Sequence, residues 1–160
     1  RSGHLRGAAT DVFPTEPKSN ADEFISPLRG IENVILTPHV GGSTEEAQER
    51  IGDEVARKLI EYSDVGSTLG SVNFPQVQLF KKGNVTRFIQ VQSNTPGELQ
   101  RLNEVFASRR INIAAQSYQT DGEIGYVVLD AEGEVEGAVE LLEEIRKLSG
   151  TIRARLLNRA

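Results

Sequence analysis

The residues best suited to chemistry lie between positions 37 and 44, in the segment TPHVGGST. His39 can exchange a proton near neutral pH, and Gly41 and Gly42 let the backbone approach a ligand closely. A helix that begins just after the glycines would favour negative charge at its N-terminus. The same pattern also fits an ordinary loop with a surface histidine, and the spacing alone does not choose between the two.

Two short apolar runs should position this segment. Residues 8–13 read as a buried strand, which Pro14 ends because proline cannot donate a hydrogen bond to a strand ladder. Residues 31–37 read as a second strand, of the kind that is buried in a parallel sheet, and it ends at Pro38. His39 would then follow the carboxyl end of a strand.

A long helix is predicted after the glycines. Ser43 and Glu46 have the spacing of a capping box, which places the helix N-cap at Ser43. The helix should continue to about Ser63. Its expected apolar stripe consists of Ala47, Ile51, Val55 and Leu59.

A linker is predicted between this helix and the second half of the chain. Residues 64–76 lack periodicity, and we expect them to dock in part through Val72 and Phe74. Residues 81–84, with the sequence KKGN, read as a turn or hinge.

The second half of the sequence has the element order β-α-β-β-α-β. Asp121 and Gly122 mark a hairpin between the second and third strands. This order is that of the ferredoxin-like fold, an antiparallel sheet with two helices on one face. The predicted strands are residues 85–92, 111–119, 125–130 and 151–156. The predicted helix stripes are Leu99, Leu102, Val105 and Phe106, and then Val135, Ala138, Val139, Leu142 and Ile145.

The composition argues against several classes of function. With 38% apolar and 26% charged residues the chain fits a soluble globular protein, and no apolar run reaches the ~18 residues that span a bilayer. The absence of cysteine and the presence of only two histidines argue against a metal site and fit the cytoplasm. A net charge of −5 without a clustered basic face argues against nucleic acid as a partner.

Two segments taken together resemble the D-isomer-specific 2-hydroxyacid dehydrogenases. They are residues 11–17, DVFPTEP, and residues 36–44, LTPHVGGST, in this order and spacing. Residues 94–99, NTPGEL, and residues 111–114, INIA, are similar to an ACT domain, a regulatory module. The combination is similar to the members of the family that oxidise 3-phosphoglycerate to 3-phosphohydroxypyruvate in L-serine biosynthesis.

The resemblance implies a catalytic pair and an NAD site. In the family, the histidine at the position of His39 exchanges the proton of the substrate hydroxyl, and a glutamate at the position of Glu16 pairs with it. A carboxylate beside an imidazole favours the imidazolium form, which can protonate a ketone oxygen as hydride arrives. By themselves, Glu16 could be an exposed loop acid and Asp11 a turn cap. The cofactor-binding residues that the resemblance implies are Asp11, His39, Val40, Gly41 and Gly42.

Other parts of the family's active site have no counterpart in this sequence. It contains no G-x-G-x-x-G dinucleotide loop and no match to the substrate-binding arginine of the family. The chain begins at Arg1 and contains no methionine, so we interpret it as the C-terminal part of a longer enzyme. We therefore expect the 160 residues alone to have no dehydrogenase activity.

The second half is expected to bind an effector. In related enzymes with this module, L-serine binds between two ACT domains and inhibits. Asn94 and Asn112 match two of the family's serine contacts, and Gln92 falls where a third contact is commonly histidine. The resemblance also implies self-association through an edge strand of the ACT domain, and a homotetramer for the full-length enzyme. The alternative is a purely structural ferredoxin-like domain.

The expected organisation is an α/β part followed by an α+β part. Residues 1–42 should form the C-terminal end of a Rossmann-type NAD-binding domain, residues 43–78 a helix and linker of the substrate domain, and residues 79–160 the ACT domain. Two other interpretations stay open. One is a free-standing amino-acid sensor, for which the implied pair of Glu16 and His39 would have no use. The other is a 2-hydroxyacid dehydrogenase for glyoxylate or a similar acid.

Overall fold

The computed structural model describes residues 2–19, 21–80 and 83–157. The chain divides into two compact units, Arg1–Asp53 and Glu54–Ala160. The turn predicted at Lys81 and Lys82 lies outside the described residues. Within the described ranges, no helix is both long and apolar enough to cross a membrane.

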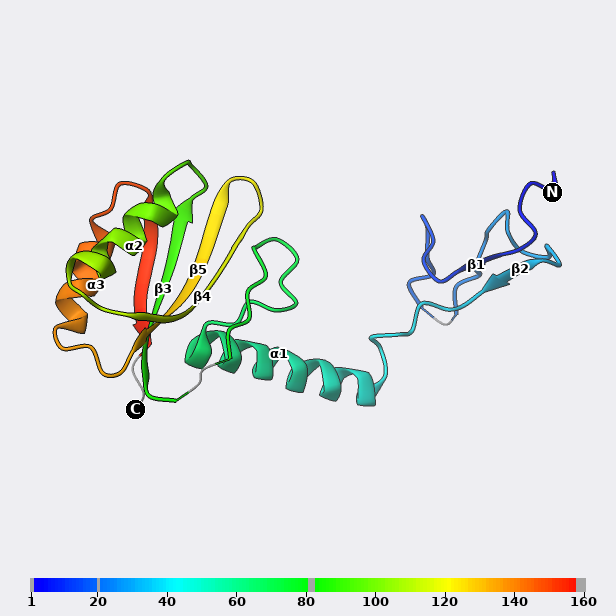
Figure 1. The fold of residues 1–160 in the computed structure, drawn as a ribbon. Helices are drawn as coiled ribbons and strands as arrows, with labels where there is room; N and C mark the ends of the chain where they lie inside the picture. Colours follow the sequence, from blue (N-terminus) through cyan, green and yellow to red (C-terminus); the bar gives the residue numbers. More distant parts are fainter. Residues whose placement is uncertain (1, 20, 81–82, 158–160) are drawn as a thin grey trace. The chain divides into compact units, whose positions relative to one another are not determined.

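The first unit contains a parallel pair of short strands. Strand β1 (Ala8–Thr10) pairs with β2 (Val34–Leu36), with Ala8 opposite Val34 (Figure 1). The parallel pairing agrees with the prediction, but both strands are shorter than predicted and their burial was predicted wrongly. Ile35 is 66% exposed, because the sheet of the described residues has only these two strands in this unit.

The long helix α1 (Glu45–Val65) begins later than the predicted cap implies. The backbone N–H of Ala47 donates to Thr44 Oγ1 at 3.1 Å, so Thr44 takes the N-cap position and the prediction of Ser43 is wrong. The predicted apolar stripe lies on the helix, but Val55 is 52% and Leu59 64% exposed. The helix ends before Gly66, whose φ of +74° is a left-handed conformation.

The second unit is a four-stranded antiparallel sheet in the order β4-β5-β3-β6, with two helices on one face (Figure 1). The Asp121-Gly122 hairpin joins β4 to β5 as predicted. The predicted ferredoxin-like order is therefore confirmed. The elements are β3 (Val85–Ser93), α2 (Glu98–Ser108), β4 (Ile113–Thr120), β5 (Ile124–Glu132), α3 (Ala138–Arg146) and β6 (Thr151–Leu157).

The core of the second unit lies between the sheet and its helices. Phe88 of β3 and Phe106 of α2 are almost completely buried and make an edge-to-face contact with ring centroids 5.3 Å apart. The predicted stripe of α2 is correct, whereas that of α3 contains one error. Val139 is 61% exposed, and Leu141 is fully buried in its place. The helical period of 3.6 residues does not determine which of two nearby apolar residues is buried.

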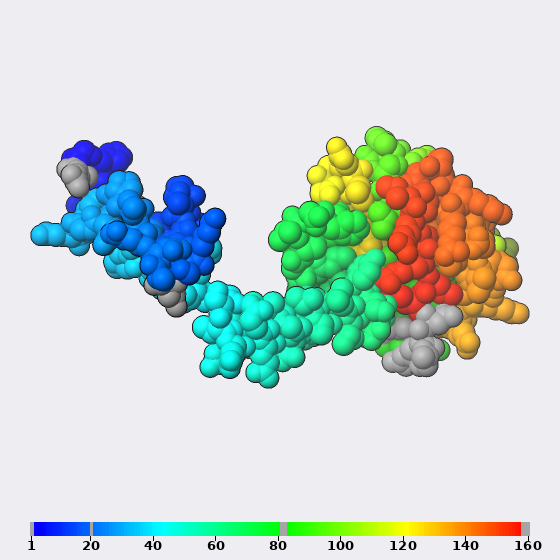
Figure 2. Space-filling model, turned by 180° about the vertical axis from the view of Figure 1, so that it is seen from behind, coloured from blue at the N-terminus to red at the C-terminus, as the bar shows by residue number. Residues whose placement is uncertain are grey.

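The opposite face of the sheet is covered by residues 66–79 of the same unit, which are coloured green in Figure 2. Val77 is 1% exposed, and the ring of Phe74 packs against Tyr126 with centroids 5.2 Å apart. The Tyr126 hydroxyl donates to the carbonyl of Gly66 at 2.8 Å, and burial raises the pKa of Tyr126 to about 12. The predicted docking of Phe74 is correct, but that of Val72 is wrong, because Val72 is 99% exposed.

A buried ion pair fastens this covering segment to the sheet. Arg87 of β3 and Asp130 of β5 have side chains that are 0% and 2% exposed, and their two nitrogen–oxygen contacts are both 2.6 Å. Arg87 Nη1 also donates to the carbonyls of Val65 and Leu79 at 2.8 Å. One guanidinium on β3 therefore contacts β5, the last residue of α1 and the last residue of the covering segment. The sequence analysis did not identify this pair.

Removing one partner of this pair should strongly destabilise the second unit. In Asp130→Ala the Arg87 charge stays buried without its counter-ion, which costs about 3–5 kcal/mol of unfolding free energy. The double variant Arg87→Met with Asp130→Ala should lose less, because no charge remains buried. Urea unfolding followed by circular dichroism measures both.

The exposed pair of Arg109 and Glu144, with side chains 37% and 45% exposed, provides a matched control. Arg109→Met should cost about 1 kcal/mol or less. An Asp130→Ala variant as stable as Arg109→Met would contradict the assigned role of the buried pair.

Candidate active site and effector site

A histidine and a glutamate form the centre of the first candidate site. His39 Nδ1 lies 2.9 Å from Glu16 Oε1 and 3.0 Å from Oε2. Their side chains are 47% and 36% exposed, so the pair is reachable from solvent. Because Nδ1 faces the carboxylate, Nε2 is the ring nitrogen available to a substrate.

Asp11 holds the backbone of the loop that carries the histidine. Its Oδ1 accepts hydrogen bonds from the His39 backbone N–H, at 3.0 Å, and from the Thr37 hydroxyl. His39 has a φ of +52°, a left-handed conformation that is uncommon for a residue with a side chain. Glu16 is fixed as well, because its Oε1 accepts the Phe13 backbone N–H at 3.0 Å. Both members of the pair are therefore oriented before any ligand binds.

The hydrogen bonds favour the charged form of each group. The hydrogen bond with Glu16 raises the pKa of His39 above its ordinary value. The Phe13 backbone N–H and then His39 lower the pKa of Glu16. The Thr37 hydroxyl and the His39 backbone N–H lower the pKa of Asp11. The ion pair therefore exists from the lowered pKa of Glu16 up to the raised pKa of His39, and deprotonation of His39 above that range removes it.

A cavity of about 560 Å³ lies beside the pair. Of the residues implied by the resemblance, Glu16, His39 and Val40 line it, whereas Asp11, Gly41 and Gly42 do not. Phe13 and Leu36 give the cavity apolar walls. The backbone at Gly41 is open on its side-chain face, since an added Cβ would meet no atom within 4 Å.

The second candidate site lies at one end of the sheet in the second unit. The Asn94 amide nitrogen donates to the carbonyl of Gly122 at 3.1 Å, and its oxygen accepts the Tyr118 hydroxyl at 3.0 Å. Gln92, two residues earlier on β3, is 1% exposed. Its Oε1 is buried and has no hydrogen-bond partner among the described residues. A buried oxygen of this kind can accept a donor from a ligand or a water.

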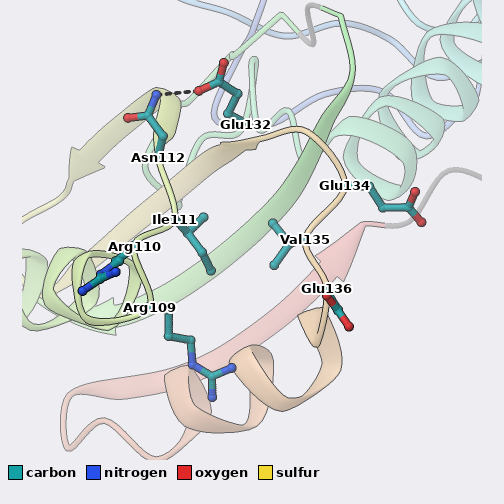
Figure 3. Close-up of a pocket in the computed structure, with 8 residues that line it drawn as sticks. All are labelled: Arg109, Arg110, Ile111, Asn112, Glu132, Glu134, Val135 and Glu136. Carbon is teal, nitrogen blue, oxygen red and sulfur yellow. Dashed lines mark hydrogen bonds between the residues drawn. The ribbon is translucent and has the colours of Figure 1, made fainter.

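Asn112 lies at the other end of the sheet, just before β4 (Figure 3). Its amide nitrogen donates to Glu132 Oε2 at 2.6 Å, beside a pocket of about 740 Å³. The eight residues of β4 separate Asn112 from the hairpin that contacts Asn94. At about 3.3 Å per residue this is roughly 25 Å. One chain therefore does not bring Asn112 together with Gln92 and Asn94.

Two polar residues that shape these sites were missed by the sequence analysis. Thr37 lies within the recognised motif, but its contact with Asp11 bridges 26 positions of sequence. Tyr118 reaches Asn94 across the sheet from 24 positions away. Only the strand register places such pairs together, so no local pattern identifies them.

Comparison with known proteins confirms both parts of the resemblance. Residues 1–41 match the D-isomer specific 2-hydroxyacid dehydrogenase, NAD binding domain, and residues 88–153 match the AHAS small subunit-like ACT domain. Over 98% of its length, the chain is 55% identical to D-3-phosphoglycerate dehydrogenase of Haemophilus influenzae. The corresponding identities are 56% for the Escherichia coli K12 enzyme and 40% for that of Dictyostelium discoideum, again over 98% of the chain. The chain spans 38% of the length of these relatives.

The pKa of His39 should depend on Glu16. Glu16→Gln removes the negative charge and should return the pKa of His39 towards its ordinary value, because imidazolium loses its partner. NMR titration of the His39 ring protons measures the shift. Glu23→Gln, which removes an exposed carboxylate paired with Arg29, is the matched control and should leave the His39 titration unchanged. An unchanged His39 pKa in Glu16→Gln would contradict the pairing.

Proposed function

We propose that this chain is the C-terminal part of an NAD-dependent D-3-phosphoglycerate dehydrogenase, a cytoplasmic enzyme that oxidises 3-phosphoglycerate to 3-phosphohydroxypyruvate in L-serine biosynthesis. The observation that carries the proposal is the pair of His39 and Glu16, held at 2.9 Å in a chain 55% identical to an enzyme of that name. The chain contributes the acid–base group of the active site. It also contributes a regulatory ACT domain.

In the proposed reaction His39 is the proton carrier. Neutral imidazole accepts the proton of the substrate hydroxyl through Nε2 during oxidation, and imidazolium returns it to the ketone oxygen in the reverse direction. Glu16 stabilises the imidazolium and fixes the ring through Nδ1. NAD supplies the hydride acceptor, and the residues proposed to hold it are Asp11, His39, Val40, Gly41 and Gly42.

The division of the chain into domains is part of the proposal. Residues 1–42 end the NAD-binding domain, residues 43–78 belong to the substrate domain and its linker, and residues 79–160 form the ACT domain. In this division residues 66–78 are a linker, and their Phe74 and Val77 pack on the sheet of the ACT domain.

The proposed effector site is built from two copies of the chain. The strand β4 forms one edge of the sheet, and an edge strand can pair with its own copy. In an antiparallel pairing of two β4 strands, the first residue of one strand lies beside the last residue of the other. Asn112 of one copy then approaches the Asp121-Gly122 hairpin of its partner, where Asn94 is bound.

The chemistry of this composite site suits an α-amino acid. The amide N–H groups of Asn94 and Asn112 can donate to a carboxylate, and the buried Oε1 of Gln92 can accept from an ammonium or hydroxyl group. L-Serine carries all three groups. Its proposed role is feedback inhibition of a homotetramer that assembles in part through these ACT domains. A free-standing amino-acid sensor is the second candidate, but the oriented pair of His39 and Glu16 favours the enzyme.

A chimera tests the dehydrogenase. The chain replaces the matching segment of the Haemophilus influenzae enzyme, and the chimera should reduce NAD with 3-phosphoglycerate. His39→Gln should lower kcat by a factor of about 10²–10⁴, because the proton carrier is lost. His4→Gln removes the other histidine and should leave kcat unchanged. The 160 residues alone should show no turnover. A chimera that keeps its full rate with His39→Gln would refute the assignment.

Mixed dimers test the composite effector site by calorimetry with L-serine. Asn94→Ala and Asn112→Ala should each weaken binding about tenfold or more, because each removes a hydrogen bond to a charged group. Co-expression with two affinity tags yields a dimer of one Asn94→Ala chain and one Asn112→Ala chain. One of its sites carries both substitutions and the other carries neither. It should therefore bind L-serine with wild-type affinity at half the stoichiometry.

Two results would count against this arrangement. If the contacts were made within one chain, the mixed dimer would have no intact site and would bind weakly at both. If the wild-type dimer released no heat with millimolar L-serine, the effector assignment itself would be wrong.

A further inference from the structure

We propose that Tyr118 is a positioning residue of the effector site, whose hydroxyl holds the Asn94 amide in the one orientation that presents an N–H to the effector. The inference rests on the proposed function and names a residue that sets the affinity and selectivity of the same site. It concerns a cross-strand contact that the chain makes by itself, before any effector or second copy is present.

The ring of Tyr118 reaches its position by lying over a glycine. Tyr118 is on β4 opposite Val127, and Gly125 is the next residue of β5 on the same face. A Cβ added to Gly125 would lie 2.6 Å from Tyr118 Cε2 and 2.8 Å from the hydroxyl oxygen. No side chain fits at that distance. Because Gly125 has none, the Tyr118 ring can lie across β5 at this position. Gly125 is also the β5 partner of Gln92 on β3, which puts Tyr118 beside the effector residues.

The two hydrogen bonds of Asn94 leave its amide a single orientation. Its Nδ2 donates to the Gly122 carbonyl, which can only accept. If the amide were flipped, its oxygen would face that carbonyl oxygen and the two acceptors would repel each other. In the observed orientation Oδ1 faces the Tyr118 hydroxyl, which donates to it at 3.0 Å. The second N–H of Nδ2 then remains available to a ligand.

This arrangement determines which ligand group Asn94 can recognise. A fixed N–H selects an acceptor such as a carboxylate. The Oε1 of Gln92, which no described residue hydrogen-bonds, selects a donor such as an ammonium group. Without the Tyr118 hydroxyl, the amide oxygen loses a partner and the side chain can rotate away, so effector binding must order it again. Tyr118 thus contributes to binding without having to touch the effector.

Calorimetry with L-serine on the 160-residue chain tests the inference. Tyr118→Phe keeps the ring and removes the hydroxyl, and it should weaken L-serine binding about fivefold with little change in thermal stability. Gly125→Ala should weaken binding by a similar or larger factor, because the new methyl displaces the ring. In a Tyr118→Ala background Gly125→Ala should have no further effect on affinity. Tyr62→Phe also removes one tyrosine hydroxyl, elsewhere in the second unit, and should bind like the wild type.

A spectroscopic readout separates positioning from general stability. The Asn94 side-chain NH₂ resonances of the free chain should shift and broaden in Tyr118→Phe and stay unchanged in Tyr62→Phe. If wild type and Tyr118→Phe bind L-serine equally well, the inference is wrong while the effector function stands. If the wild type binds no L-serine although it forms dimers, the effector function fails and the inference fails with it.

Discussion

One buried charge pair in the second unit connects two strands of the sheet with the segment that covers it. Arg87 and Asp130 are removed from water inside the sheet, and such a pair is tolerated only when the remaining hydrogen-bonding groups are also satisfied. The carbonyls of Val65, the last residue of α1, and Leu79, the last residue of the covering segment, accept the further hydrogen bonds of Arg87. The C-terminal end of α1 is thereby fixed to the sheet of the second unit.

In the first unit, one carboxylate organises the loop that carries His39. A single carboxylate oxygen of Asp11 accepts the His39 backbone N–H and the Thr37 hydroxyl, which holds His39 in a left-handed conformation. That conformation places the imidazole against Glu16. The orientation of the His39–Glu16 pair is therefore determined by contacts within residues 11–39. The two short strands of the described residues leave apolar side chains such as Ile35 exposed.

The proposed effector residues would form a site only where the edge strands of two copies pair. Asn112 lies just before β4, and Asn94 contacts the hairpin that follows β4. Within one chain they are too far apart to hold one amino acid. A two-fold pairing of the edge strands would bring them together twice. Effector binding would then favour the dimer over the monomer, because the ligand would contact both copies.

The sequence by itself determined the element order and the hairpin at Asp121-Gly122, because these rest on local periodicity and turn chemistry. The motif around His39 was identified through its resemblance to a known family. The cap of α1 was predicted at Ser43, one residue before Thr44. Val139 was predicted on the buried face of α3 in place of Leu141, since both positions are compatible with the helical period. Only the tertiary structure decided the partners of Asp11, Arg87 and Tyr118. Those contacts depend on strand register and on chain segments 24 to 43 residues apart, which no local pattern encodes.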